Sequence, residues 1–348
     1  MIPIKELLEL ATTKRASDVL IGVNLPPLFK VDGEIIRSEF RPLGVEECQN
    51  LIFSMLTPKK VEEFVKKKEV DSSFGLNNLG RFRLNVHYQR GSVACAVKIV
   101  PNLIPDLENL GFPGIVKEFL KQKFGLVLIT GPQGNGKSTT IASMIEEINL
   151  TRPSHIITIE NPIEFTHKNK KSMIEQREVG PDTDSSLEAL RHVRRQACDV
   201  IMLDEMSDLE TIEEVLKAAE LGQLILSTMH ASSSADAIER IIEIFPEAKR
   251  NQIAFQLSIA LQGIICQQLI PRKDGKGRVL ACEIILIDKA LRGLIKTGDI
   301  DEVKKYLDSG GMKGSISMRK FIEDLFRKGI VGEDSLRKKT EREYEEIS

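Results

Sequence analysis

Residues 126–139 read Leu126-Val127-Leu128-Ile129-Thr130-Gly131-Pro132-Gln133-Gly134-Asn135-Gly136-Lys137-Ser138-Thr139, an apolar run followed by the pattern G-x-x-x-x-G-K-S. An apolar strand, a glycine-rich loop and the start of a helix form the setting in which this pattern binds phosphate. Glycines let the backbone wrap closely around an anion, and the first N–H groups of the next helix point at that anion. The helical spacing of Ile141, Ile145 and Ile148 favours this interpretation over a glycine-rich turn that matches by chance.

The residues of this loop have distinct expected roles. Lys137 is expected to neutralise the β- and γ-phosphates of a nucleotide, and the Ser138 hydroxyl is expected to ligate Mg²⁺. The complete predicted nucleotide-binding set is Gly131, Pro132, Gln133, Gly134, Asn135, Gly136, Lys137, Ser138 and Thr139.

Length and composition narrow the class of protein. A chain of 348 residues is too long for one ordinary core and indicates two domains. With 29% charged and 41% hydrophobic residues it has the composition of a soluble globular protein. The net charge of -2 argues against a general nucleic-acid binder, so no nucleic-acid partner is expected.

The cysteines and the apolar runs indicate the compartment. The five cysteines contain no C-x-x-C pair, so neither a disulfide framework nor a thiolate zinc site is predicted, and a reducing cytosol fits best. No apolar run approaches the length of about 18 residues that a membrane-spanning helix needs. We therefore expect any membrane role to be exercised through a partner.

The pattern along the chain predicts two domains and a linker. Residues 1–100 are predicted to form a small α+β domain, in which Asp32-Gly33 signals a hairpin turn. Residues 101–113 are rich in proline and glycine and are predicted to be a semi-rigid linker. Residues 114–348 alternate apolar strands with helical segments, which predicts an α/β fold with a mainly parallel sheet. Within it, residues 251–269 are expected to be helical and residues 278–287 to form a strand.

Polar residues follow each predicted strand of the second domain. Glu160 to Glu164 follow one strand, Asp204-Glu205 follow the next, and His230 follows a third. Ligands of parallel sheets bind outside the carboxyl ends of the strands, so these residues are expected to gather around the phosphate loop.

The residue types predict a hydrolytic site. Asp204-Glu205 resembles a Walker B element, whose acidic groups hold Mg²⁺. Glu164 is a candidate to orient or deprotonate the attacking water, because that role needs a carboxylate near the γ-phosphate. His230 is a candidate γ-phosphate sensor, with a structural histidine as the alternative.

The stretch Gly80-Arg81-Phe82-Arg83-Leu84-Asn85-Val86-His87-Tyr88 alternates strictly between apolar and polar residues. Arg81 and Arg83 therefore project from the same face of a strand. Two interpretations stay open at this point: a clamp for a phosphate, which a neighbouring subunit could hold, or ordinary solvation of an exposed face.

These motifs resemble the secretion ATPases of the type II/IV superfamily and, within it, the PilT-like ATPases of twitching motility. The resemblance covers residues from about 15 to 330. It rests on Ala16-Ser17-Asp18, Val31-Asp32-Gly33, Gly80 to Asn85, Thr158 to Phe165, Gln176-Arg177-Glu178-Val179-Gly180, Glu205-Met206 and Met229-His230.

The resemblance implies a PAS-like N-terminal domain joined to a RecA-like ATPase domain with a C-terminal helical region, assembled as a homohexamer. It implies ATP and Mg²⁺ as cofactors, with Ser138, Asp204 and Glu205 at the metal. Glu164, Glu205, His230, Arg81 and Arg83 take the catalytic positions that it implies.

The implied function is retraction of type IV pili. The implied partners are an inner-membrane platform protein and, indirectly, pilin, for a cytoplasmic protein that is peripheral at the inner membrane through this machinery.

The chain departs from the family pattern at several positions. Asn161 stands where the family usually has Asp, Asp204 where it commonly has Gly, and Ser207 where it has Arg. Asn161 motivates an alternative, a poorly hydrolysing regulatory paralogue of the motor. A pilus-assembly or type II secretion ATPase is a further alternative, although such relatives commonly carry paired C-x-x-C motifs. A nucleic-acid motor fits less well because the chain has no Trp and only 3 Tyr for stacking on bases.

Overall fold

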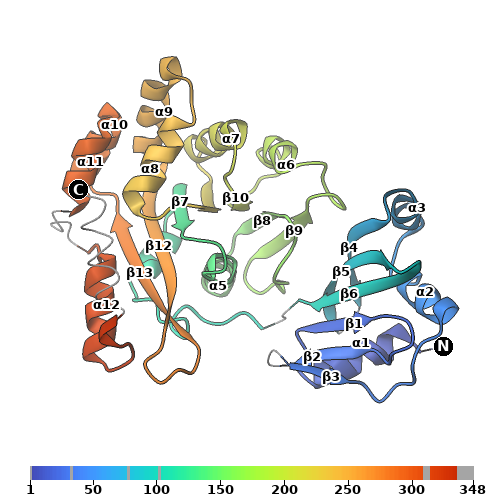
Figure 1. The fold of residues 1–348 in the computed structure, drawn as a ribbon. Helices are drawn as coiled ribbons and strands as arrows, with labels where there is room; N and C mark the ends of the chain where they lie inside the picture. The colour runs from blue at the N-terminus through green and yellow to red at the C-terminus, as the bar shows by residue number, and fades with distance from the viewer. Residues whose placement is uncertain (1, 32–33, 77–78, 101–102, 309–313, 335–348) are drawn as a thin grey trace. The chain divides into compact units, whose positions relative to one another are not determined.

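The structure, a computed structural model, describes residues 2–31, 34–76, 79–100, 103–308 and 314–334 (Figure 1). The chain forms two compact units. The first contains Met1–Leu103 and Glu164–Thr166, and the second contains Ile104–Ile163 and His167–Ser348. Each unit is built around hydrophobic clusters of its own.

The first unit is an antiparallel sheet with helices packed against it. Its described helices are α1 (Ile4–Thr13), α2 (Val45–Phe53) and α3 (Pro58–Lys67). Its described strands are β1 (Asp18–Ile21), β2 (Leu28–Val31), β3 (Glu34–Arg37), β4 (Glu69–Leu76), β5 (Gly80–Gln89) and β6 (Ser92–Ile99). They pair in the order β3-β2-β1-β6-β5-β4. The predicted Asp32-Gly33 turn lies outside the described residues, and the strands on either side of it pair antiparallel.

Strand β5 has the predicted alternation. Phe82, Leu84 and Val86 are buried in the core of the first unit, while Arg81 and Arg83 are partly exposed on the other face. The two arginines therefore project side by side, as expected from their spacing of two residues.

The second unit is organised around a mostly parallel sheet. The strands are β7 (Gly125–Thr130), β8 (His155–Glu160), β9 (Met173–Glu178), β10 (Val200–Glu205), β11 (Leu224–Met229), β12 (Leu261–Pro271) and β13 (Arg278–Leu286). Their order is β13-β12-β7-β11-β10-β8-β9, and among the described strands only β13 pairs antiparallel to its neighbour. The predicted α/β fold with a mainly parallel sheet is confirmed.

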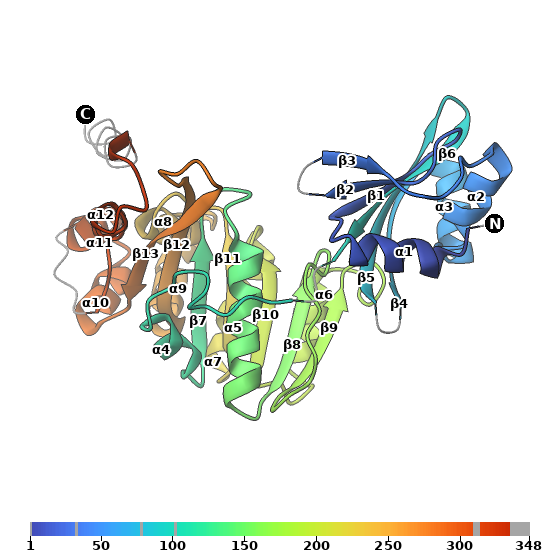
Figure 2. The same cartoon turned by 90° about the horizontal axis from the view of Figure 1, so that it is seen from below.

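Helices cover both faces of this sheet (Figure 2). The described helices of this unit are α4 (Val116–Leu120), α5 (Lys137–Thr151), α6 (Ser186–Val193), α7 (Leu209–Glu220), α8 (Ser234–Glu243), α9 (Glu247–Ala260), α10 (Lys289–Thr297), α11 (Ile300–Asp308) and α12 (Met318–Arg327), of which α10 packs on α9 and α11 packs on α8. Val127 and Ile129 of β7 pack with α4 and α5, whereas Leu126 and Leu128 pack with α6 to α9. All of β7 is buried, as expected for the central strand of a sheet covered on both faces.

The helix expected over residues 251–269 is wrong in its second half. Helix α9 ends at Ala260, and β12 begins at Leu261 and runs between β7 and β13. Short apolar runs fit a buried helix and a buried strand equally well, and here pairing with β7 and β13 decides for the strand. Among the described residues, no helix is long and apolar enough to cross a membrane.

Candidate active site

The phosphate loop, residues 131–136, connects the carboxyl end of β7 to the first turn of α5. Gly136 precedes α5 with a φ of 85°, so the chain turns sharply into the helix. Gly131 has a φ of 142° and passes close to the backbone of Gln267 in β12. This turn aims the first N–H groups of α5 back over the end of the sheet, as anion binding requires.

The ammonium group of Lys137 reaches back over this loop. Its Nζ donates hydrogen bonds to the carbonyl oxygens of Gly131, at 2.7 Å, and Pro132, at 3.1 Å. Burial lowers the pKa of Lys137, although the nearby charges of Glu205 and Asp204 oppose this shift. The site thus holds a partly desolvated cation that an anion bound in the loop would stabilise.

A polar chain of three side chains crosses the carboxyl ends of neighbouring strands. It consists of Lys137, His230 and Glu205. Lys137 Nζ lies 3.4 Å from His230 Nδ1, and His230 Nε2 lies 3.5 Å from Glu205 Oε1. An ammonium group can only donate, so the contact with Lys137 is a hydrogen bond in the tautomer in which Nδ1 accepts. The predicted gathering of these strand ends is confirmed, because β7, β11 and β10 are adjacent and parallel.

The Asp204 carboxylate lies on the side of β10 toward β8. Its Oδ2 accepts a hydrogen bond of 3.3 Å from the backbone N–H of Asn161, which directly follows β8. The backbone carbonyl oxygen of Asp204 accepts a hydrogen bond from the Thr228 hydroxyl of β11. Asp204 is thus hydrogen-bonded toward both strands that flank β10.

The residues expected at a magnesium ion carry oxygen atoms, the ligand type that Mg²⁺ prefers. Ser138 lies in the first turn of α5, and Asp204 and Glu205 end β10. Among the described residues, no group of three His, Cys, Asp or Glu side chains could hold a metal ion by itself. Mg²⁺ commonly takes one or two carboxylates and completes its shell with phosphate oxygens and water. Ser138, Asp204 and Glu205 are the residues that would hold it if the prediction is right, and their role at the metal stays a prediction.

The β12–β13 hairpin braces the phosphate loop, a feature that the sequence interpretation missed. Gln267 Nε2 donates to the Asn135 carbonyl at 2.7 Å, and the Leu269 N–H donates to Asn135 Oδ1 at 2.8 Å. Arg278 Nη1 reaches the Gly134 carbonyl at 3.4 Å. Gln267 lies beside the loop because β12 pairs with β7, a contact between segments far apart in the sequence.

The remaining predicted residues belong to the first unit. Arg81 Nη2 donates to the Ser73 hydroxyl at 2.9 Å, and Arg83 Nη1 lies 3.8 Å from Glu164 Oε1. The Arg83 and Glu164 side chains are 33% and 44% exposed, so their mutual attraction is worth about 0–1 kcal/mol. Their catalytic roles stay predictions.

Comparison with known proteins identifies the family. The model of the family described as "Type II/IV secretion system protein" matches residues 106–330. The chain belongs to this family. The predicted resemblance is therefore confirmed, and the phosphate loop and the polar chain from Lys137 to Glu205 lie inside the matched range.

Individual members of the type II/IV secretion family match almost the whole chain. The type IV pilus retraction ATPase PilT of Pseudomonas aeruginosa is 37% identical over 97% of this chain and 97% of its own length. The type IV pilus ATPase PilU of the same organism is 36% identical, over 95% of this chain and 87% of its own length. A crystal structure of the pilus retraction motor PilT with bound ADP has a TM-score of 0.88 and 42% identity, covering 97% of this chain and 96% of that one.

Proposed function

We propose that this ATPase of the type II/IV secretion family is the hexameric motor that retracts type IV pili for twitching motility. The end-to-end match to PilT carries the proposal, because it covers both units and not the nucleotide-binding unit alone. The polar chain from Lys137 through His230 to Glu205 supports hydrolysis, since it places a cation and a carboxylate at the phosphate loop.

The second unit supplies the nucleotide site in this proposal. Residues 131–139 bind the phosphates of ATP, and Lys137 neutralises their charge. Ser138, Asp204 and Glu205 hold Mg²⁺, which supplies charge neutralisation at the phosphate oxygens when it is bound. His230 responds to the γ-phosphate, because it already contacts both Lys137 and Glu205.

Glu164 orients or deprotonates the attacking water, and Arg81 and Arg83 stabilise the charge that develops on the transferred group. Hydrolysis around a homohexameric ring drives rotations that move pilin through an inner-membrane platform protein. The motor itself is cytoplasmic and reaches the membrane through this partner.

Two substitutions test the hydrolytic site. Lys137→Ala should abolish both ATP binding and turnover, because the loop loses its cation. Glu205→Ala should abolish turnover while ADP still binds, because the carboxylate acts on hydrolysis and the loop is intact. Lys123→Ala, an exposed side chain just before the amino end of β7 and far along the strand from the loop, is the matched control and should keep full activity. ATP hydrolysis in Glu205→Ala at the wild-type rate would refute its assigned role.

The second candidate is a poorly hydrolysing paralogue that regulates a separate motor. The match to PilU and the presence of Asn161 in place of Asp favour it. The wild-type measurement in the same assay separates the two functions. A rate on the order of 1 s⁻¹ or faster supports the motor, since that is the low end of ordinary enzyme turnover.

A further inference from the structure

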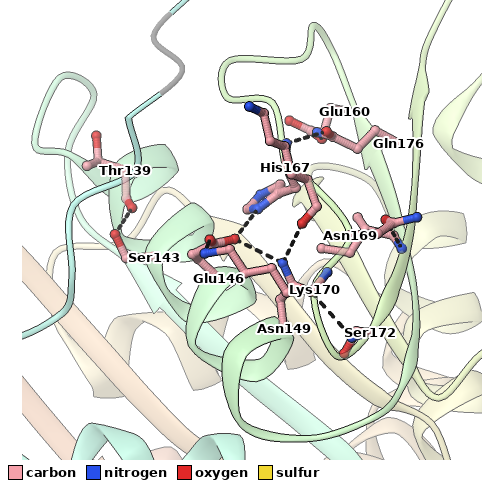
Figure 3. A network of polar contacts seen from close by, with 12 residues as sticks. Thr139, Ser143, Glu146, Asn149, Glu160, His167, Asn169, Lys170, Ser172 and Gln176 are labelled. Atoms are coloured by element: carbon pink, nitrogen blue, oxygen red, sulfur yellow. Dashed lines mark hydrogen bonds and ion pairs between the residues drawn. The ribbon is translucent and has the colours of Figure 1, made fainter.

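The segment between β8 and β9, residues 161–172, carries Glu164, and its two flanks, residues 161–163 and 167–172, are hydrogen-bonded at several points to other elements of the second unit (Figure 3). The Gln176-Arg177-Glu178 motif of β9, to which the proposed function assigns no role, supplies two of these points. The other points come from α5, the helix that begins at the phosphate loop.

Two side chains of β9, Gln176 and Glu178, accept backbone hydrogen bonds on either side of Glu164, and we call this pair the bracket. Glu178 Oε2 accepts a hydrogen bond of 3.0 Å from the backbone N–H of Ile163, immediately before Glu164. Gln176 Oε1 accepts one of 2.8 Å from the backbone N–H of His167, three residues after it. Gln176 and Glu178 are two residues apart on one strand, so both side chains point to the same side.

The amide of Gln176 is held in the orientation that this contact needs. Its Nε2 donates to Glu160 Oε1 at 3.0 Å, and the Thr158 hydroxyl donates to the same oxygen at 2.6 Å. Because Glu160 occupies the NH₂ end of the Gln176 amide, the carbonyl end faces the His167 N–H (Figure 3).

On the C-terminal side of Glu164, the His167 ring contacts a side chain of α5. The ring is almost fully buried, and its Nδ1 lies 3.2 Å from Glu146 Oε2. Glu146 also accepts hydrogen bonds from Lys170 and, at 3.2 Å, from Asn149 Nδ2. His167 is therefore held by its backbone to β9 and by its ring to α5.

Asn149 extends this attachment along the segment. Its Nδ2 donates to the Lys168 carbonyl at 2.8 Å, and its Oδ1 accepts from the N–H groups of Lys170, at 3.1 Å, and Ser172, at 3.4 Å. The Asn149 side chain is fully buried. Residues 167–172 are thus joined to the phosphate-loop helix by several hydrogen bonds.

We propose that Gln176 and Glu178 of β9, together with the His167–Glu146 contact, are positioning residues that fix Glu164 for hydrolysis and make it follow α5. The proposal rests on the proposed function, in which Glu164 acts on the attacking water. Only three residues lie between the two bracketed amides, so the path of the backbone at Glu164 is short and its freedom is small. A shift of about 1 Å in a group that orients a reactant can lower the rate of the chemical step about 100-fold.

The test combines substitution of the bracket with substitution of the base. Gln176→Met removes the acceptor for the His167 N–H and keeps the length of the side chain. It should lower kcat at least about tenfold with the dissociation constant of ADP unchanged within about twofold, because Glu164 is displaced and the loop is not. In a Glu164→Gln background, Gln176→Met should change the single-turnover rate by less than about twofold, because the group that it positions is no longer a base.

A conservative pair at Glu178 separates positioning from general stability. Glu178→Gln keeps an acceptor oxygen for the Ile163 N–H and should retain kcat, whereas Glu178→Leu removes it and should lower kcat as Gln176→Met does. Lys168→Ala, an exposed side chain of the same segment, is the control and should leave kcat unchanged. The Glu178 pair also decides the matter if Gln176→Met does not fold.

The outcomes that overturn the proposal are distinct. Equal losses from Gln176→Met with and without Glu164 would show that Gln176 does not act through Glu164, and would refute the positioning role alone. A fall in ADP affinity that matches the fall in kcat would show a merely structural role. A wild-type rate in Glu164→Gln would refute the base itself, and the positioning role with it.

Discussion

At Gly131 the backbone has a φ of 142°, and a Cβ atom there would lie 2.3 Å from the Gln267 carbonyl oxygen of β12. We predict that Gly131→Ala destabilises the protein by about 1–3 kcal/mol, because a rigid backbone atom must move to admit the methyl group. Nucleotide affinity should also fall, because the start of the phosphate loop is displaced. Thermal unfolding and titration with a fluorescent ADP analogue measure the two effects.

Gly134 gives the matched control for this substitution. It also has a positive φ, 74°, but a Cβ atom at this position would have no heavy atom within 4 Å beyond those of its two chain neighbours. Gly134→Ala should therefore cost only the left-handed backbone penalty of about 1–2 kcal/mol. Equal loss of ADP affinity in the two variants would show that close approach to β12 is not what requires glycine at position 131.

Site residues could be predicted from the sequence where they follow the carboxyl end of a predicted parallel strand, because ligands bind there. Lys137, Glu205 and His230 each follow an apolar strand, and parallel strands bring their carboxyl ends together, so the sequence predicted that these residues gather at one edge of the sheet, but not the contacts between them. Gln267 was not predictable in this way. It lies in the middle of a strand, and its contact with Asn135 depends on the pairing of β12 with β7.

Among the elements, α5 and the 161–172 segment share a buried histidine whose charge state affects stability. Burial lowers the pKa of His167, while its hydrogen bond to Glu146 opposes the shift and the charge of Lys170 reinforces it. The folded protein therefore keeps His167 neutral at a pH where the unfolded chain, with a pKa of about 6.5, binds a proton. Above the pKa of His167 in the unfolded chain, both states are neutral and His167 does not affect stability. As the pH falls below that value, protonation of the unfolded chain lowers the free energy of unfolding, until the pH reaches the pKa of His167 in the folded protein.

We predict that the free energy of unfolding of the wild-type protein falls more steeply between about pH 7.5 and pH 5.5 than that of His167→Gln. Glutamine can still donate to Glu146 and does not titrate. The contribution of Glu146 changes only at lower pH: burial raises its pKa, but hydrogen bonds from Lys170, Asn149 and His167 outweigh burial and bring the pKa below 4.5. Denaturant unfolding at each pH measures the slopes, and parallel slopes would contradict the prediction.

Local sequence patterns predicted most elements of the second unit. Strand β12 is an exception, because the apolar spacing at residues 251–269 predicted a helix. Ile253, Leu257, Leu261 and Ile264 have helical spacing, yet the first two belong to α9 and the last two to β12. The helix ends at Ala260 because the next residues pair with β7 on one side and β13 on the other. The pairing with β7 joins residues more than 100 positions apart, so no local window of the sequence contains it.

At the scale of the whole molecule, the proposed catalytic groups are divided between two units with separate cores. Arg81 and Arg83 lie on β5 of the first unit, whereas Lys137 begins α5 of the second. In the homohexamer that we propose, the arginines at a given phosphate loop could come from its own chain or from a neighbouring chain. Local sequence patterns identify both sets of residues but contain no information about which chain supplies the arginines.

We predict that the arginines act on the nucleotide of a neighbouring subunit. The double variant Arg81→Ala/Arg83→Ala and the variant Lys137→Ala should each be inactive alone, since each lacks one half of every site. In rings mixed at random from equal amounts of the two variants, a subunit with intact Lys137 stands beside one with intact arginines at about a quarter of the interfaces, so mixing should restore ATP turnover to at most about a quarter of the wild-type rate. If the arginines served their own chain, no chain in the mixture would carry both halves, and the mixed rings would stay as inactive as either variant.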